Sequence, residues 1–119
     1  MTGRLLLVDD EPDIRAIAKM SLERIGGWEV TAAASAAEAL AAAQSATPDV
    51  VLLDVMMPDT DGPATLVQLR PLLGDRTPVI FLTAKGESAS LLALGAAGVI
   101  SKPFDPISLP REVAAITAR

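Results

Sequence analysis

The sequence contains no cysteine, no histidine and no tyrosine, and aromatic residues make up only 3% of its 119 residues. Without cysteine the chain can form neither disulfides nor thiolate metal sites. Without histidine it can carry no phosphohistidine, and it lacks the side chain that most often acts as a general base. Any histidine chemistry must therefore come from a partner.

Long apolar runs and basic clusters are also missing. No apolar run approaches the roughly 20 residues that are needed to span a bilayer, and the N-terminal residues Met1 to Arg4 lack a signal-peptide pattern. The net charge is −5 and the ten basic residues are scattered singly, whereas binding to a phosphate backbone requires a basic patch. We therefore expect a cytoplasmic protein with no membrane association and no direct nucleic-acid binding by this chain.

The residues that are present suit one folded domain over 1–119. Half of them are hydrophobic and 21% are charged, which is enough for a full core. Apolar runs bounded by turn signals predict strands at 5–8, 28–33, 49–53, 78–82 and 98–101. Helical periodicity, prolines and capping residues predict helices from 12 to about 25, 35 to about 45, 63 to about 74, after 86 to 94, and after 103 to 119.

This alternation of strands and helices indicates the fold class. Continuous apolar strands that are joined through helices imply a parallel sheet covered on both faces. Right-handed crossovers then give a doubly wound α/β domain with about five strands and about five helices. In such sheets ligands bind beyond the carboxyl ends of the strands, so the residues just after each strand are the candidate functional residues.

Polar side chains follow four of the five expected strands. Asp9 and Asp10 come after the first strand, Asp54 after the third, Thr83 after the fourth and Lys102 after the fifth. Carboxylates held close together repel one another and raise the pKa of at least one of them. A divalent cation relieves this repulsion, and magnesium suits a site of few carboxylates with water and phosphate oxygens.

The same residues suit phosphoryl chemistry. A carboxylate such as Asp54 can act as a nucleophile toward phosphorus and form an acyl phosphate. Lys102 provides a compact positive charge for a phosphoryl oxygen, and Thr83 provides a hydroxyl donor. Catalysis at such a site would consist mainly of positioning and charge neutralisation.

Taken in order, five short motifs of the chain resemble those of a response-regulator receiver domain, as found in chemotaxis regulators. The motifs are Val8-Asp9-Asp10-Glu11-Pro12, Leu53-Asp54-Val55-Met56-Met57-Pro58, Asp61-Gly62, Thr83-Ala84 and Lys102-Pro103-Phe104. The resemblance covers essentially the whole chain. It implies a flavodoxin-like fold with strand order 2-1-3-4-5 and a role as a signalling switch in a two-component system.

The resemblance also implies a role for each site residue. Asp54 matches the phosphoacceptor, Thr83 the switch hydroxyl and Lys102 the ion-pair partner of the phosphoryl group. The implied magnesium ligands are Asp9, Asp10, Asp54 and the backbone carbonyl of Met56. The implied phosphoryl donor is a histidine kinase or a histidine phosphotransfer protein, and the output protein is unknown. Such a domain is a monomer or a phosphorylation-dependent dimer, and it catalyses only its own phosphorylation and slow dephosphorylation.

Three details of the chain refine this expectation. The Lys102-Pro103 bond is cis in the resembled family, so a cis bond is expected here. The family usually has an aromatic residue three positions before the lysine, where this chain has Val99, which puts the usual aromatic relay of the signal in doubt. Pro110 lacks an N–H, so we expect a broken or tightened first turn and a regular last helix only from about Pro110.

Simpler interpretations and other functions compete with this reading. Asp9 and Asp10 could merely cap the first helix, and Thr83 and Lys102 could be a cap and a solvated charge.

A receiver-like interaction domain that does not use phosphate is one alternative function. An aspartyl-phosphate phosphatase is another, although the second acid that such enzymes place two residues after the nucleophile is Met56 here. A nucleotide-binding protein would need a glycine-rich loop after the first strand.

Overall fold

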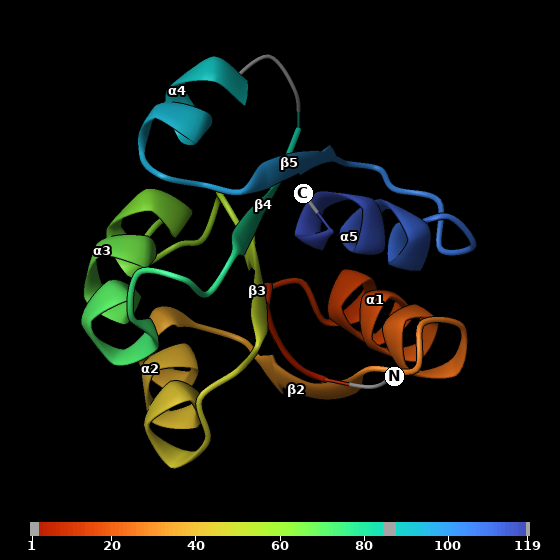
Figure 1. The fold of residues 1–119 in the computed structure, drawn as a ribbon, viewed down its shortest axis with the longest axis horizontal. Coiled ribbons are helices and arrows are strands. Elements are labelled where there is room, and N and C mark those ends of the chain that lie inside the picture. Colours follow the sequence, from red (N-terminus) through yellow and green to blue (C-terminus); the bar gives the residue numbers. More distant parts are fainter. Residues whose placement is uncertain (1–2, 85–87, 119) are drawn as a thin grey trace.

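The computed structural model describes residues 3–84 and 88–118, and within them five parallel strands alternate with five helices (Figure 1). The strands are β1 (Arg4–Val8), β2 (Glu29–Ala33), β3 (Val50–Asp54), β4 (Val79–Thr83) and β5 (Gly98–Ser101). The helices are α1 (Pro12–Arg24), α2 (Ala36–Ser45), α3 (Gly62–Leu73), α4 (Ser88–Ala93) and α5 (Leu109–Thr117). The order in the sheet is β2-β1-β3-β4-β5, which confirms the predicted doubly wound topology.

The sheet lies between two layers of helices. Figure 1 shows α1 and α5 on one side of the sheet and α2, α3 and α4 on the other. Every residue of β3 and β4 is buried, because these central strands are covered on both faces. Alternate strand residues belong to two separate hydrophobic clusters. Leu53 and Phe81 belong to the cluster that contains residues of α3, whereas Leu52 and Leu82 belong to the cluster that contains residues of α1 and α5.

Local sequence signals set the helix starts. Pro12 is the first residue of α1, as predicted. The Ser35 side chain accepts a hydrogen bond from the Glu38 N–H, and the Glu38 carboxylate accepts one from the Ala34 N–H. This reciprocal arrangement is the one that a capping box predicts. Helix α3 begins at Gly62, one residue before the predicted start, because the Asp61 side chain caps it.

The predicted break before the last helix is confirmed. Residues 106–108 form a turn, and α5 begins only at Leu109, the residue before Pro110. Asp105 holds this turn: its side chain accepts a hydrogen bond from the Ile107 N–H, and its carbonyl accepts one from the Leu109 N–H. The helix ends at Thr117; the predicted helix end at Arg119 and part of the predicted loop after Thr83 lie outside the described residues.

The Lys102-Pro103 peptide bond is cis, as the resemblance led us to expect. It directly follows β5, at the edge of the sheet where the carboxyl ends of the parallel strands meet. This edge carries the polar residues that the sequence places after the strands. In the described part of the chain, no helix is both long enough and apolar enough to cross a membrane.

Candidate functional site

Four of the predicted site residues lie at the carboxyl edge of the sheet. Asp9 directly follows β1, Asp54 and Thr83 are the last residues of β3 and β4, and Lys102 directly follows β5. Asp9, Asp54 and Thr83 are 0%, 2% and 2% exposed. Burying polar groups is unfavourable unless they are paired, so this concentration of buried polar side chains sets the edge apart from the rest of the core.

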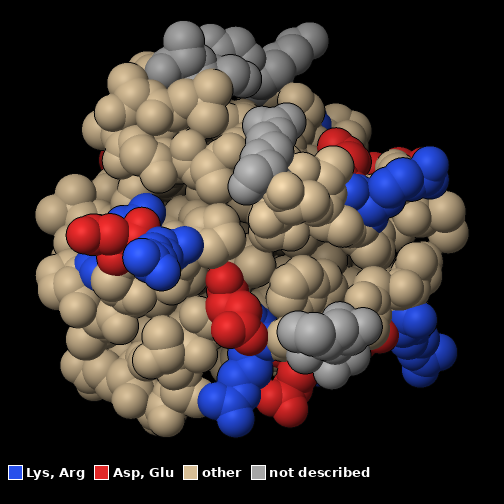
Figure 2. All heavy atoms as spheres, viewed as in Figure 1, with Lys and Arg blue, Asp and Glu red and all other residues tan. Residues whose placement is uncertain are grey.

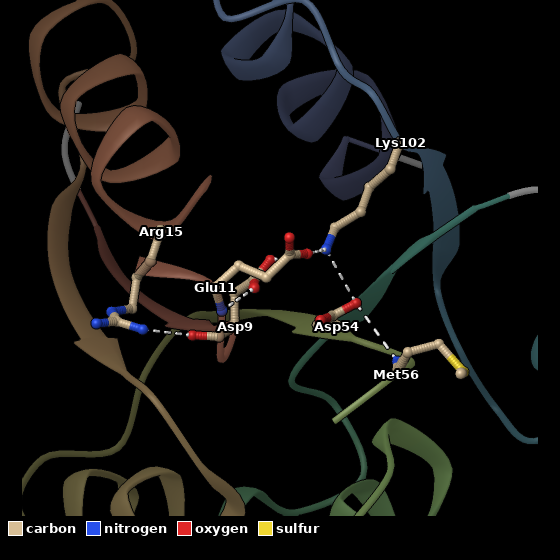
Figure 3. Close-up of polar contacts among 6 residues, drawn as sticks. All are labelled: Asp9, Glu11, Arg15, Asp54, Met56 and Lys102. Atoms are coloured by element: carbon tan, nitrogen blue, oxygen red, sulfur yellow. Dashed lines mark hydrogen bonds and ion pairs between the residues drawn. The ribbon is translucent and has the colours of Figure 1, made fainter. Parts of the chain in front are cut away.

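Lys102 is at the centre of the group. Its ammonium nitrogen lies 3.0 Å from Asp9 Oδ2, 3.2 Å from Asp54 Oδ1 and 3.2 Å from Glu11 Oε1 (Figure 3). Burial lowers the pKa of Lys102, but its contacts with Asp9 and then with Asp54 outweigh this effect and raise the pKa to about 12. Lys102 is therefore a permanent positive charge at the site and not a solvated surface lysine.

The loop after β1 fixes the carboxylate of Asp9. Asp9 Oδ1 accepts a hydrogen bond from the Glu11 N–H at 2.9 Å, and the Asp9 carbonyl accepts one from Arg15 Nη1 at 2.8 Å (Figure 3). Neither Asp9 nor Asp10 occupies the N-cap position of α1. Glu11 does, and its side chain makes no capping hydrogen bond. The simple helix-cap interpretation of the two aspartates therefore does not describe this loop.

Asp54 is in an environment that disfavours its charge. Burial and then the negative charge of Asp9 raise the pKa of Asp54 from 3.8 to about 6, although Lys102 works in the opposite direction. Asp54 Oδ1 faces Lys102 and accepts a long hydrogen bond of 3.4 Å from the Met56 N–H. Asp54 Oδ2 is buried and has no hydrogen-bond partner among residues 3–84 and 88–118. A carboxylate in this state gains from any cation or donor that reaches its second oxygen.

Gly62 allows the chain to pass close behind Asp54. A Cβ atom at this position would lie 2.5 Å from the Asp54 carbonyl oxygen and 2.8 Å from the Val55 Cα. The Gly62 N–H donates to the Val55 carbonyl at 2.8 Å. Close backbone approach and not a left-handed conformation is the reason for this glycine, because Gly62 is not among the glycines with positive φ.

The acidic residues of the edge suit a hard cation. One carboxylate oxygen from each of Asp9, Glu11 and Asp54 lies within 4.8 Å of the other two. Carboxylate oxygens are the ligands that magnesium and calcium prefer. The residues present therefore fit a divalent cation, in agreement with the buried Asp54 Oδ2, which has no hydrogen-bond partner in the part of the chain that the structure describes.

Glu11 is a member of this group that the sequence reasoning did not select. The feature of the sequence that could have indicated Glu11 is its position as the third acid in the run after the first strand. Asp10, which was expected as a metal ligand, is half-buried, lines a small hollow with Met57 and Pro58, and is not one of these three carboxylates. The Met56 side chain is 73% exposed, and its backbone N–H contacts Asp54.

Thr83 and Val99 lie on the side of the site formed by β4 and β5. The Thr83 hydroxyl is buried and finds no hydrogen-bond partner in the part of the chain that the structure describes. The Thr83 carbonyl accepts a 2.7 Å hydrogen bond from the Lys102 N–H, which ties the ends of the two strands together. Val99 is half-buried, pairs with Phe81 across the strands and packs against the core that contains Phe81.

Comparisons with known proteins agree with this geometry. The family model "Response regulator receiver domain" matches residues 5–114. The chain is 40% identical to response regulator Rre1 of Synechocystis over 97% of its own length and 52% of that protein. It is 39% identical to the alkaline phosphatase synthesis transcriptional regulatory protein PhoP of Bacillus subtilis, covering 100% of this chain and 50% of that one. The chain thus spans about half the length of these curated relatives.

A solved structure matches over nearly its whole length. The Vibrio cholerae chemotaxis protein CheY4 superposes with a TM-score of 0.89 at 33% sequence identity. The match covers 98% of this chain and 99% of that protein.

Proposed function

We propose, from the premise that this chain belongs to the response regulator receiver family, that it is a phosphoacceptor switch of a two-component system. Asp54 accepts a phosphoryl group from a histidine kinase or a histidine phosphotransfer protein, and the domain then changes its surface for an output partner. The observation that carries this proposal is the Asp54 carboxylate, which is buried beside the Lys102 ammonium and has one oxygen without a hydrogen-bond partner among the described residues.

The chain's own residues suit each part of the transfer. An Asp54 oxygen attacks the phosphorus, the P–N bond of the donor phosphohistidine breaks, and the imidazole leaves with the electron pair. Lys102 neutralises charge on a phosphoryl oxygen, and the Thr83 hydroxyl donates to another. In the reverse half of the cycle, water attacks the phosphorus and the P–O bond to Asp54 breaks, so the carboxylate is restored and phosphate leaves.

Magnesium is the proposed cofactor. Asp9 and Asp54 would hold it directly or through water, with Asp10 and the Met56 backbone carbonyl as further ligands. When it is bound, the ion would neutralise the charge that develops on the phosphoryl oxygens. A bound ion would also relieve the repulsion between Asp9 and Asp54, which is one cause of the raised pKa of Asp54.

The surface is consistent with protein partners for the domain over 1–119. On the face shown in Figure 2, the lysine and arginine side chains of the described residues lie beside acidic ones and form no continuous basic patch, and the net charge of the whole chain is −5. Direct nucleic-acid binding by this domain is therefore not part of the proposal. The proposal also includes a cytoplasmic location and an oligomeric state that is a monomer or a phosphorylation-dependent dimer.

The test is incubation with acetyl phosphate and magnesium, followed by intact-mass measurement. The parent chain should gain one phosphoryl group, and Asp54→Asn should gain none. Asp59→Asn, which removes an exposed carboxylate from the following loop, is the matched control and should be labelled like the parent. Equal labelling in the presence of EDTA would contradict the proposed role of the metal, and labelling of Asp54→Asn would contradict the assignment of the acceptor.

A further inference from the structure

Three carboxylates surround the ammonium nitrogen of Lys102. A lysine ammonium has three donors, and three carboxylates, from Asp9, Asp54 and Glu11, lie 3.0, 3.2 and 3.2 Å from its nitrogen. A phosphoryl oxygen on Asp54 that is to be neutralised by Lys102 needs one of these donors. We therefore expect one of the existing contacts to be released when the phosphoryl group arrives.

The three carboxylates differ in how deeply they are buried. The Asp9 side chain is fully buried and that of Asp54 is 4% exposed, whereas the Glu11 side chain is 59% exposed. Glu11 makes no capping hydrogen bond to α1, so its contact with Lys102 is not reinforced from the helix. An ion pair with an exposed carboxylate contributes little to stability, and the Glu11 contact is therefore the one that yields first.

We propose that Glu11 is a positioning residue that holds one N–H of Lys102 in the unphosphorylated protein and releases it to a phosphoryl oxygen on Asp54. The release has a direct electrostatic cause. The phosphoryl group brings additional negative charge to Asp54, which attracts the ammonium and repels the Glu11 carboxylate. This inference rests on the proposed function, since it describes how Lys102 becomes available for the phosphoryl group.

The first test measures the affinity of beryllofluoride, a phosphoryl mimic, by titration calorimetry at a magnesium concentration that saturates each variant. Glu11→Ala removes the competing contact, so beryllofluoride should bind about two- to fivefold more tightly than to the parent, which is the range that an exposed ion pair allows. Asp13→Ala is the matched control. It removes the same charge from the first turn of the same helix but lies outside the Lys102 contacts, and its affinity should equal that of the parent.

The second test follows Lys102 directly by NMR. The chain has three lysines, so the Lys102 side-chain Cε–Hε signal can be assigned with Lys102→Arg. Glu11→Ala should shift this signal in the free protein, because the contact with Glu11 is lost. In the beryllofluoride complex the Lys102 signals of the parent and of Glu11→Ala should coincide, because the parent has already released Glu11.

Separate results would overturn the two proposals. A parent chain that does not bind beryllofluoride with magnesium would refute the proposed function, and the role of Glu11 with it. A parent that binds, with Glu11→Ala binding no more tightly, would refute the role of Glu11 alone. The same gain in beryllofluoride affinity in Asp13→Ala would show a general effect of charge, and it would also refute the role of Glu11. A shift difference that persists in the complex would mean that Glu11 stays in contact with Lys102.

Discussion

The fully buried carboxylate of Asp9 has its Oδ2 atom 3.0 Å from the ammonium of Lys102. The pair joins the loop after β1 to the segment after β5, across the central strands of the sheet. Removing one partner of a buried pair leaves an uncompensated charge, which costs more than the pair itself contributes. The stability of the fold therefore depends on the balance of positive and negative charge at this edge of the sheet.

Lys102→Met tests this dependence because it removes the cation and keeps much of the apolar stem. We expect the free energy of unfolding of the metal-free protein to fall by about 3 kcal/mol at pH 8. The loss should be smaller at pH 5, since Asp54, with its pKa of about 6, takes up a proton there. Urea denaturation in EDTA at the two pH values measures both quantities.

Lys19→Met is the control for that measurement. Lys19 pairs with Glu23 at 2.9 Å on the surface of α1, where both side chains are more than a third exposed. Such a pair between helix neighbours contributes roughly 0.3–0.5 kcal/mol. Losses of equal size in the two lysine variants would contradict the view that Lys102 neutralises buried charge.

The pH dependence of the free energy of unfolding should reflect the titration of Asp54. Its pKa is about 6 in the folded protein and 3.8 as an ordinary carboxyl, so the folded state binds the proton more tightly than the unfolded state. This group therefore lowers stability as the pH rises from about 4 to 6, by about 3 kcal/mol in total. In EDTA, the stability of Asp54→Asn relative to the parent should increase over that range and then level off.

Asp59→Asn again provides the comparison, because it makes the same chemical change at an exposed position. The groups that face Asp54 are Asp9 and Lys102, with Glu11 beyond Lys102. A stability difference between Asp54→Asn and the parent that stays constant from pH 4 to pH 7 would show that burial does not raise the pKa of Asp54.

The fold was predictable because its signals are local. The apolar runs of β3 and β4 can be satisfied only by burial on both faces. Pro12 and the Ser35–Glu38 pair mark helix starts through contacts within one turn. Pro110 also acts locally, since its missing N–H disfavours a continuous helix through the preceding turn. Each of these features is decided by residues close together in the sequence.

The candidate site was predictable only in part, because some of its features depend on contacts between distant segments. The contact of Glu11 with Lys102 joins positions 91 residues apart, and no local pattern distinguishes Glu11 from Asp10. Asp9 and Asp10 are adjacent, yet one is fully buried against Lys102 and the other lines a separate hollow. The need for Gly62 likewise comes from the approach of another backbone segment and not from its own turn.

Magnesium should stabilise the chain if the crowded carboxylates are its site. Binding to the folded state alone adds about 2.7 kcal/mol at a concentration one hundred times the dissociation constant. Thermal melts with and without magnesium at matched ionic strength measure this gain, and Asp9→Asn should reduce it by weakening the binding. An unchanged melting temperature, in spite of saturation shown by calorimetry, would contradict the argument from crowded carboxylates.

The last prediction concerns how the signal leaves the site. A ligand shifts a conformational equilibrium only through contacts that differ between the two states. The Thr83 hydroxyl can supply such a contact, because it is buried and free of hydrogen-bond partners among the described residues. Val99 is β-branched and therefore stiff about its first side-chain dihedral, and it already packs against the core. We therefore expect Thr83 and the backbone from Ala84 onward, rather than Val99, to transmit the change toward β5 and α5.

Amide chemical-shift changes on adding beryllofluoride and magnesium test this expectation without a known partner. In the parent, residues of β5 and α5 should shift, and a useful switch needs a coupling of roughly 1–3 kcal/mol. Thr83→Ala should bind the mimic yet lose most of the shifts in β5 and α5, because the differential contact is gone. Val99→Ala changes only packing and should largely keep them. If Val99→Ala abolished the distant shifts and Thr83→Ala preserved them, Val99 would be the relay.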